Sequence, residues 1–192
     1  LSGMETVEPD VGYLHVYSNN VVEFRNSESG NFDVWEFPDP ESVYVIGADV
    51  AEGLAYGDFS SAHIINASNG YVAAAWHGHV EPDIFGEMLA QMGWWYNTAL
   101  LGIESNNHGL TTLKAAQKLG YRNLYKQRRL SKVTPLATDT LGWRTTVSSK
   151  PLAIDELSGA LRNLELEIYC DKTLAELKTF VRKPNGKMSG SP

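Results

Sequence analysis

The stretch 43-VYVIGAD-49 is a short, continuous apolar run, rich in β-branched residues, that ends in a carboxylate. A run of this kind predicts a strand covered on both faces rather than an edge strand. A second run, 99-ALLGIE-104, has the same form and ends at Glu104. In α/β folds, ligands bind beyond the carboxyl ends of the strands. If the two strands are parallel neighbours, Asp49 and Glu104 therefore emerge at the same edge of one sheet.

The residues around these two runs predict the other elements of the fold. Residues 61–67 and 71–77 flank Asn69-Gly70, which supplies the positive φ angles of a tight turn, so a hairpin beside the first strand is expected. Apolar residues at three- and four-residue spacing after Pro82 predict an amphipathic helix. Further helices are expected at 109–119, 150–164 and 174–181, and further strands at 123–127 and 167–169. This order predicts an α/β fold in which helices flank a central mixed five-stranded sheet.

The N-terminal part has a different pattern. Residues 1–12 are polar and lack periodicity, whereas residues 13–37 alternate between apolar and polar side chains, as expected for a small antiparallel meander. Pro38-Asp39-Pro40 then forces an extended break. We therefore divide the chain into a tail with a β-meander, residues 1–40, and a main domain, residues 41–192.

Composition limits the class of protein. A chain of 192 residues with 43% hydrophobic and 20% charged residues matches one globular domain. Its single cysteine, Cys170, excludes an internal disulfide framework and a cysteine-based zinc cage. No run approaches the roughly 18 apolar residues of a membrane span, and no secretory signal is recognisable. We expect a protein that is neither secreted nor inserted in a membrane.

Charge is distributed unevenly along the chain. The net charge is -7, but residues 1–113 hold 16 acidic residues and one basic residue, whereas residues 114–192 hold 15 basic and 7 acidic residues. Such a division suits a protein that binds cations in one region and a polyanion in another. The alternative is that the charges are segregated by chance on a solvated surface.

The two strand-end carboxylates are the best candidates for chemistry. Mg²⁺ and Mn²⁺ prefer oxygen ligands, and a pair of such ions about 4 Å apart can activate a water and stabilise a leaving oxygen in phosphodiester hydrolysis. The alternative is that Asp49 and Glu104 are ordinary cap or turn residues. His77-Gly78-His79 also has a spacing seen in metal sites, but a third ligand is missing, so a structural role is favoured.

Basic residues in the second half indicate where DNA would bind. Lys and Arg side chains that do not read base edges contact the phosphate backbone of DNA of any sequence. The alternative is that these residues belong to a solvated charged loop. The candidates are Lys126, Arg128, Arg129, Lys132, Arg144 and Lys150. No GxxxxGK[ST] phosphate loop occurs, so no ATP site is expected in this chain.

Four segments in order resemble the nuclease domain of the large terminases of tailed bacteriophages. They are VIGADVAEGLAYGDFSSAHIIN, GIESNNHGLTTLKAAQKLGYRNLY, LGWRTTVSSKPLAIDEL and LAELKTFVRKPNGKMSG, and together they extend over about residues 44–190. The resemblance implies an RNase H-like fold and a metal-dependent endonuclease that cuts concatemeric double-stranded DNA during genome packaging by a two-metal-ion mechanism.

Carried over by position, the resemblance implies that Asp49 and Glu104 are catalytic, metal-binding residues. Asp58, in the turn Gly57-Asp58-Phe59-Ser60, also matches a recurrent position and is a candidate auxiliary ligand; the alternative is a turn-forming Asp. Asn107 and His108 follow Glu104 closely enough to orient a water or touch a phosphate. A helix cap is an equal alternative for Asn107, and a surface role is the alternative for His108.

The family normally adds a further carboxylate from an Asp pair expected just beyond Gly190, so we expect a truncated site. Asp155 is an alternative donor of this carboxylate, although Asp155 can also be an ordinary solvent-facing residue of the helix.

The implied partners are an ATPase domain, a portal protein and a small terminase subunit, in the host cytoplasm and transiently at the procapsid portal. Two alternatives remain: another RNase H-like nuclease of the resolvase or integrase type, and a non-catalytic module that docks on DNA or the portal.

Overall fold

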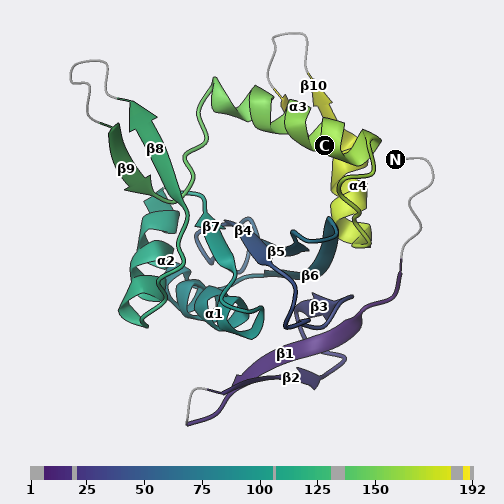
Figure 1. Ribbon diagram of the computed structural model, residues 1–192, viewed down its shortest axis with the longest axis vertical. Coiled ribbons are helices and arrows are strands. Elements are labelled where there is room, and N and C mark those ends of the chain that lie inside the picture. Colours follow the sequence, from purple (N-terminus) through teal and green to yellow (C-terminus); the bar gives the residue numbers. More distant parts are fainter. Residues whose placement is uncertain (1–6, 19–20, 106, 131–136, 183–187, 191–192) are drawn as a thin grey trace.

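The computed structural model describes residues 7–18, 21–105, 107–130, 137–182 and 188–190. These residues build one mixed seven-stranded sheet, two separate hairpins and four helices (Figure 1). The sheet order is β2-β1-β3-β6-β5-β4-β7, and β4 and β7 are its parallel pair. The strands are β1 (Asp10–Val16), β2 (Val22–Asn26), β3 (Phe32–Val34), β4 (Tyr44–Asp49), β5 (Ser60–Asn66), β6 (Tyr71–Gly78) and β7 (Leu100–Ile103).

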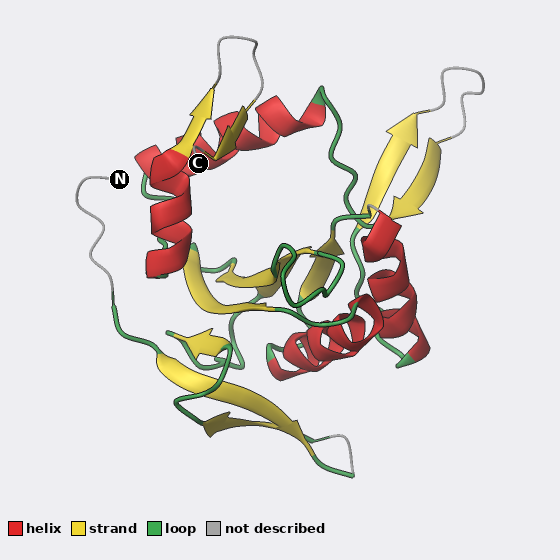
Figure 2. Cartoon of the chain, turned by 180° about the vertical axis from the view of Figure 1, so that it is seen from behind, coloured by secondary structure: helices red, strands yellow, loops and turns green. Residues whose placement is uncertain are grey.

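Helices lie on both sides of this sheet. The helices are α1 (Pro82–Trp95), α2 (Asn107–Lys118), α3 (Ser149–Arg162) and α4 (Asp171–Thr179). Helices α1 and α2 pack together against one face, while α4 lies on the opposite side and α3 spans the space from the β8–β9 hairpin to α4 (Figures 1 and 2). The hairpins are β8 (Lys126–Leu130) with β9 (Ala137–Leu141), and β10 (Phe180–Arg182) with β11 (Met188–Gly190). No helix in the described ranges is long and apolar enough to cross a membrane.

The alternation of side chains along β4 decides which face of the sheet is filled. Tyr44, Ile46 and Ala48 are buried in the main core with residues of α1 and α2. Gly47 and Asp49 point to the other face and are exposed. The expectation that this strand is covered on both faces is therefore wrong: it is paired on both edges, but one face is open at its carboxyl end.

A second, smaller core covers the far end of the open face. Val72, Ile168, Cys170 and Leu174 are buried there, and Leu161 of α3 packs against them. Cys170 is a buried free thiol. This core anchors α4 over β5 and β6 and leaves the end of the face near β4 and β7 accessible.

The predicted fold class is confirmed, with differences in the number and pairing of strands. The meander is continuous with the main sheet because β3 pairs with β6, so the sheet has seven strands rather than five. The strands expected at 123–127 and 167–169 reach the sheet only through single bridges, at Leu124 and Glu167, and β8 instead pairs with β9. The turn before β6 has a positive φ at Gly70 alone, because its loop is four residues long rather than a two-residue Asn-Gly turn.

We predict that the close approach of α1 and α2 makes Gly86 sensitive to substitution. A Cβ at Gly86 would lie 2.3 Å from the carbonyl oxygen of Thr112 and 2.8 Å from Cβ of Ala115. Gly86→Ala should lower the free energy of unfolding by about 1–3 kcal/mol, measured by urea denaturation. In the control Gly159→Ala on α3, where a Cβ meets nothing within 4 Å, the same change should stabilise by about 0.5–1 kcal/mol. Equal effects at both positions would contradict this packing.

Candidate active site

The parallel pairing of β4 and β7 brings Asp49 and Glu104 together. Ala48 is in register with Ile103, and the backbone N–H of Glu104 donates to the carbonyl of Ala48 at 3.0 Å. The next residue on each strand therefore stands at the same edge of the sheet, on the open face. The strands are adjacent and parallel, so the condition under which the sequence placed both carboxylates at one edge is met.

The two carboxyl groups interact directly. Partial burial, the negative charge of Glu104 and a hydrogen bond between the two side chains raise the pKa of Asp49 above its usual range. The charge of Asp58 raises this pKa further, as a smaller contribution, while a hydrogen bond from the backbone of Val50 opposes the shift. An acidic group whose charged form is destabilised in this way is stabilised by a cation.

A row of side chains crosses the open face through this pair. Successive register partners on neighbouring strands are Trp143, Glu104, Asp49, Ser61 and His77. Asp49 and Glu104 thus lie in the middle of the row, between an aromatic residue on one side and a hydroxyl and an imidazole on the other.

A cavity of about 380 Å³ opens beside Asp49, between the sheet and α4. Asp49, Asp58, His63 and His77 line it together with Thr173 of α4, whose Oγ1 lies 2.8 Å from Nε2 of His63. Burial is the main cause that lowers the pKa of His63 and of His77. Both imidazoles are thereby biased toward the neutral form.

The sequence pattern favoured a structural role for His77 and did not predict a role for His63. The signal was present: alternation along 61–67, read with the antiparallel pairing of the hairpin, places Ser61, His63 and His77 on the same face as Asp49. No local sequence pattern predicted that α4 packs over these side chains.

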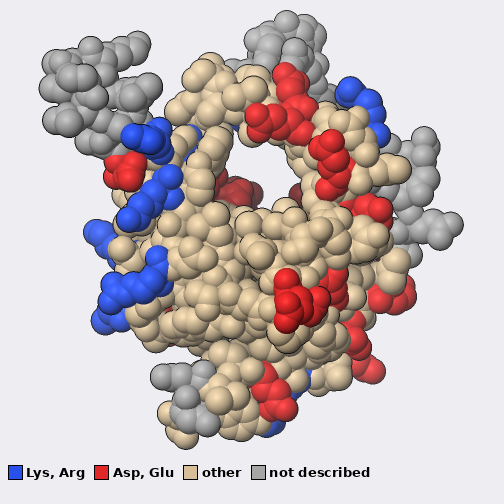
Figure 3. All heavy atoms as spheres, in the orientation of Figure 1, with Lys and Arg blue, Asp and Glu red and all other residues tan. Residues whose placement is uncertain are grey.

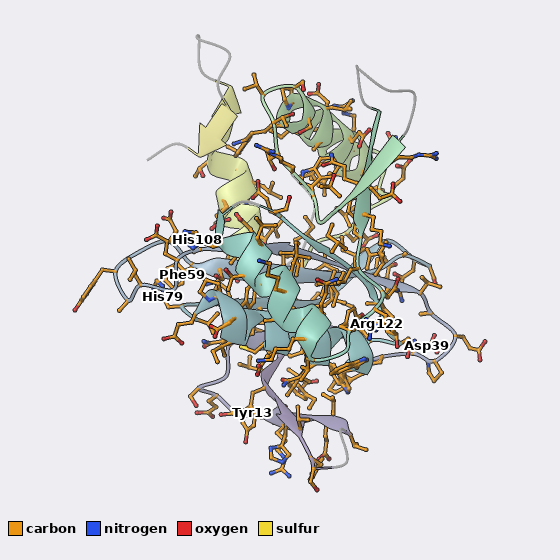
Figure 4. All side chains as sticks on the ribbon, turned by 90° about the vertical axis from the view of Figure 1, so that its left-hand side faces the viewer. Tyr13, Asp39, Phe59, His79, His108 and Arg122 are labelled. Atoms are coloured by element: carbon orange, nitrogen blue, oxygen red, sulfur yellow. The ribbon has the colours of Figure 1, made fainter. Side chains whose placement is uncertain are left out.

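The loop before β5 carries Asp58 to this cavity. The ring of Phe59 is stacked on the rings of both His77 and His79, with centroid distances of 4.3 and 4.0 Å. Figure 4 shows Phe59 beside His79. This stack holds Asp58 beside the site, because Asp58 and Phe59 are adjacent in the chain. Asp58 also borders a second cavity of about 540 Å³, where Nε2 of His108 lies 3.4 Å from a carboxylate oxygen of Glu52.

The other candidates differ in where they lie. Asn107 begins α2, and its side chain lies outside the described residues. His108 faces the Asp58 loop rather than the cavity that Asp49 lines. Asp155 lies exposed on α3 and lines none of these cavities.

The donor set of the site is a pair of carboxylates with Asp58 nearby. Within the described ranges, neither Asp49 nor Glu104 forms an ion pair with Lys or Arg, and no three His, Cys, Asp or Glu side chains are grouped as a metal site. Carboxylate oxygens without a cationic partner suit a hard divalent ion. The assignment of Asp58 as a ligand stays a prediction.

Basic residues gather on one side of the molecule. Lys and Arg lie over α2 and the β8–β9 hairpin, whereas many Asp and Glu lie on the opposite side, and acidic atoms are visible deep in the hollow between them (Figure 3). We call this surface the basic flank; its exposed members are Lys114, Lys118, Arg122, Lys126, Arg128 and Arg144. Lys150 is exposed at the start of α3, while Lys132 and the side chain of Arg129 lie outside the described residues.

Comparison with solved structures gives consistent matches over most of the chain. The large terminase nuclease of thermophilic phage G20c with bound magnesium is 18% identical, covers 86% of this chain and 81% of its own, and has a TM-score of 0.67. The chain has the fold of the large terminase nucleases. The nuclease domain of Thermus phage P74-26 is 20% identical over 85% of this chain and 76% of its own, with a TM-score of 0.59. The G20c terminase nuclease was also solved with cobalt and with zinc. Comparisons with known protein families and with curated proteins give no match.

Proposed function

We propose that this chain is a divalent-metal-dependent endonuclease acting on double-stranded DNA, in the role of a terminase large subunit that cuts concatemers during packaging. The observation that carries the proposal is the interaction of Asp49 with Glu104 at the paired ends of β4 and β7, on a fold shared with terminase nucleases. Two adjacent acids on an accessible sheet face, where burial and the charge of Glu104 raise the pKa of Asp49, fit a cation site better than a structural one.

In this proposal Asp49 and Glu104 hold Mg²⁺ or Mn²⁺, with Asp58 as an auxiliary donor. The bound metal would supply Lewis-acid stabilisation of the phosphate oxygens and an activated water. The carboxylates fix where the metal sits, since the strands that carry them are hydrogen-bonded to each other. The imidazole of His77, whose pKa is lowered mainly by burial, lines the same cavity as Asp49, and we propose that it orients a water there.

The remaining parts of the proposal concern context. The basic flank would hold the DNA backbone, and Lys150, Arg129 and Lys132 are proposed to extend it. An ATPase domain, a portal protein and a small terminase subunit are proposed partners in the host cytoplasm and at the procapsid portal. Residues 41–192 are proposed as the nuclease domain, with residues 1–40 as a tail and a meander that extends its sheet.

The test of this function is plasmid cleavage by the purified chain in Mg²⁺ or Mn²⁺. We expect nicked and linear products that disappear when excess chelator is added. Cleavage that persists in chelator would overturn the proposal. A strong preference for branched DNA over plasmid would favour a resolvase-type nuclease, and DNA binding without cleavage in either metal would favour a docking module.

We predict that neutralising part of the basic flank lowers the salt dependence of DNA binding. In the triple variant Lys126→Gln, Arg128→Gln and Arg144→Gln, the slope of log K against log salt should fall by about 0.9 for each phosphate that is no longer neutralised, equally for unrelated sequences. Fluorescence anisotropy over a salt series measures this slope. Arg25→Gln, on the distant strand β2, is the control and should leave it unchanged. An unaltered slope in the triple variant would place the DNA elsewhere.

A further inference from the structure

In addition to the two cavities already described, a third cleft adjoins the carboxylates, on the side away from α4. Its volume is about 310 Å³. It is lined by Gly47, Ala48, Gly102, Glu104, Tyr125 and Trp143. It therefore shares Glu104 with the candidate active site and opens on the same face of the sheet.

The floor of this cleft consists of two glycines whose lack of a side chain is not required by the fold. Gly47 and Gly102 are register partners on β4 and β7, and neither has a positive φ. A Cβ built on Gly47 meets nothing within 4 Å. In contrast, a Cβ on Gly12, in β1, would lie 2.0 Å from the carbonyl oxygen of Arg25. Glycine weakens a strand, so an unforced glycine in a strand often marks a place where a ligand comes close.

Two aromatic residues form the walls, and main-chain hydrogen bonds to β7 hold both. The N–H of Tyr125 donates to the carbonyl of Leu101 at 2.9 Å, and the N–H of Trp143 donates to that of Ile103 at 2.8 Å. The two rings are tilted by 46°, with centroids 6.3 Å apart. The walls are therefore positioned by the same strand that carries Glu104.

The residues that line the cleft indicate which part of a nucleic acid it would bind. Its charged member is Glu104, which repels phosphate, while its aromatic faces and bare backbone suit apolar and flat groups. A deoxyribose ring and its base present such surfaces, and in a DNA strand they stand directly beside a phosphate. We propose, resting on the nuclease function above, that this cleft binds the nucleoside next to the phosphate that is cut, from an intact duplex or from a locally unpaired strand.

The test uses Gly47→Leu, which fills the cleft and leaves both carboxylates in the chain, with Gly159→Leu on α3 as the matched control. Trp143→Ala removes a wall and serves as the second variant. Each is titrated, by fluorescence anisotropy, against a labelled thymidine oligonucleotide and a labelled duplex in chelator, so that no strand is cut. Thermal unfolding and Mn²⁺ binding are measured alongside.

We expect the dissociation constant to rise about tenfold in Gly47→Leu and in Trp143→Ala, and not in Gly159→Leu. A rise with the single strand alone identifies an unpaired nucleoside, and a rise with both DNAs identifies the sugar face of the duplex. The unfolding midpoint of Gly47→Leu should not fall, and its Mn²⁺ binding should match the wild type. Wild-type affinity of both variants for both DNAs, or failure of Gly47→Leu to fold, would overturn the proposal. Because binding is read without cleavage, it stands apart from a failure of the proposed nuclease activity.

Discussion

Asp49→Asn is expected to remove DNA cleavage almost completely while the chain stays folded. The substitution keeps the size of the side chain but removes the carboxylate charge that we propose binds the metal, in the middle of the cross-strand row. Metal stabilisation of a phosphoryl transition state contributes several kcal/mol, so the rate of plasmid nicking should fall at least about a hundredfold. The free energy of unfolding without metal should be equal or slightly higher, because repulsion from Glu104 is relieved.

The control for this experiment is Asp155→Asn, which removes an acidic charge on α3, outside the cavities around Asp49. It should leave the nicking rate within about twofold, as expected for a change away from the chemistry. If Asp49→Asn nicks plasmid as fast as the wild type, Asp49 is not part of the active site. If Asp155→Asn abolishes nicking instead, α3 supplies the missing carboxylate.

Divalent metal is expected to raise the thermal stability of the wild-type chain and to leave Asp49→Asn nearly unchanged. An ion at about 100 times its dissociation constant stabilises the folded state by about 2.7 kcal/mol, or roughly 5–10 °C in Tm for a domain of this size. Differential scanning calorimetry with and without Mn²⁺ measures the shift. An equal shift in wild type and Asp49→Asn would mean that the ion binds elsewhere.

The Mn²⁺-induced shift in Tm should also depend on pH in a defined direction. The folded-state pKa of Asp49 lies above its value in the unfolded chain, so the folded state binds this proton more tightly. Without metal, the contribution of Asp49 to stability is most favourable below the usual Asp pKa and is lost as the pH rises through the raised value. Protons compete with metal for the carboxylates, so the Mn²⁺-induced rise in Tm should shrink as the pH falls from the raised pKa of Asp49 toward the usual pKa of Asp. A rise in Tm that grows toward acid pH would contradict the assigned direction.

The sequence was sufficient to predict the centre of the fold. Two apolar runs that each end in an acid predicted β4 and β7, and the parallel register of Ala48 with Ile103 then brings Asp49 and Glu104 together. These patterns predict the strands because a strand that packs on a core is apolar on its buried face, and its end leaves the next side chain at the sheet edge. The expected cover on both faces of β4 is wrong, because one face is open.

Features that depend on contacts between distant segments could not be predicted in the same way. The pairing of β3 with β6 is set by Phe32 opposite Trp76, two residues far apart in the chain. The strand expected at 123–127 reaches the sheet only through the single bridge at Leu124, and the polar run that follows this bridge forms β8, which pairs with β9. Likewise, the contact of His63 with Thr173 joins residues separated by more than half of the chain.

The cleavage rates of Asp49→Asn, Glu104→Gln and the double variant, measured on supercoiled plasmid in Mn²⁺, test the central claim most directly. If the two carboxylates hold one metal site, each single change disables it, and the double variant should be no slower than the slower single variant. Rates that fall by independent factors, so that the double loss equals the product of the single losses, would show that the residues act separately and contradict a shared site.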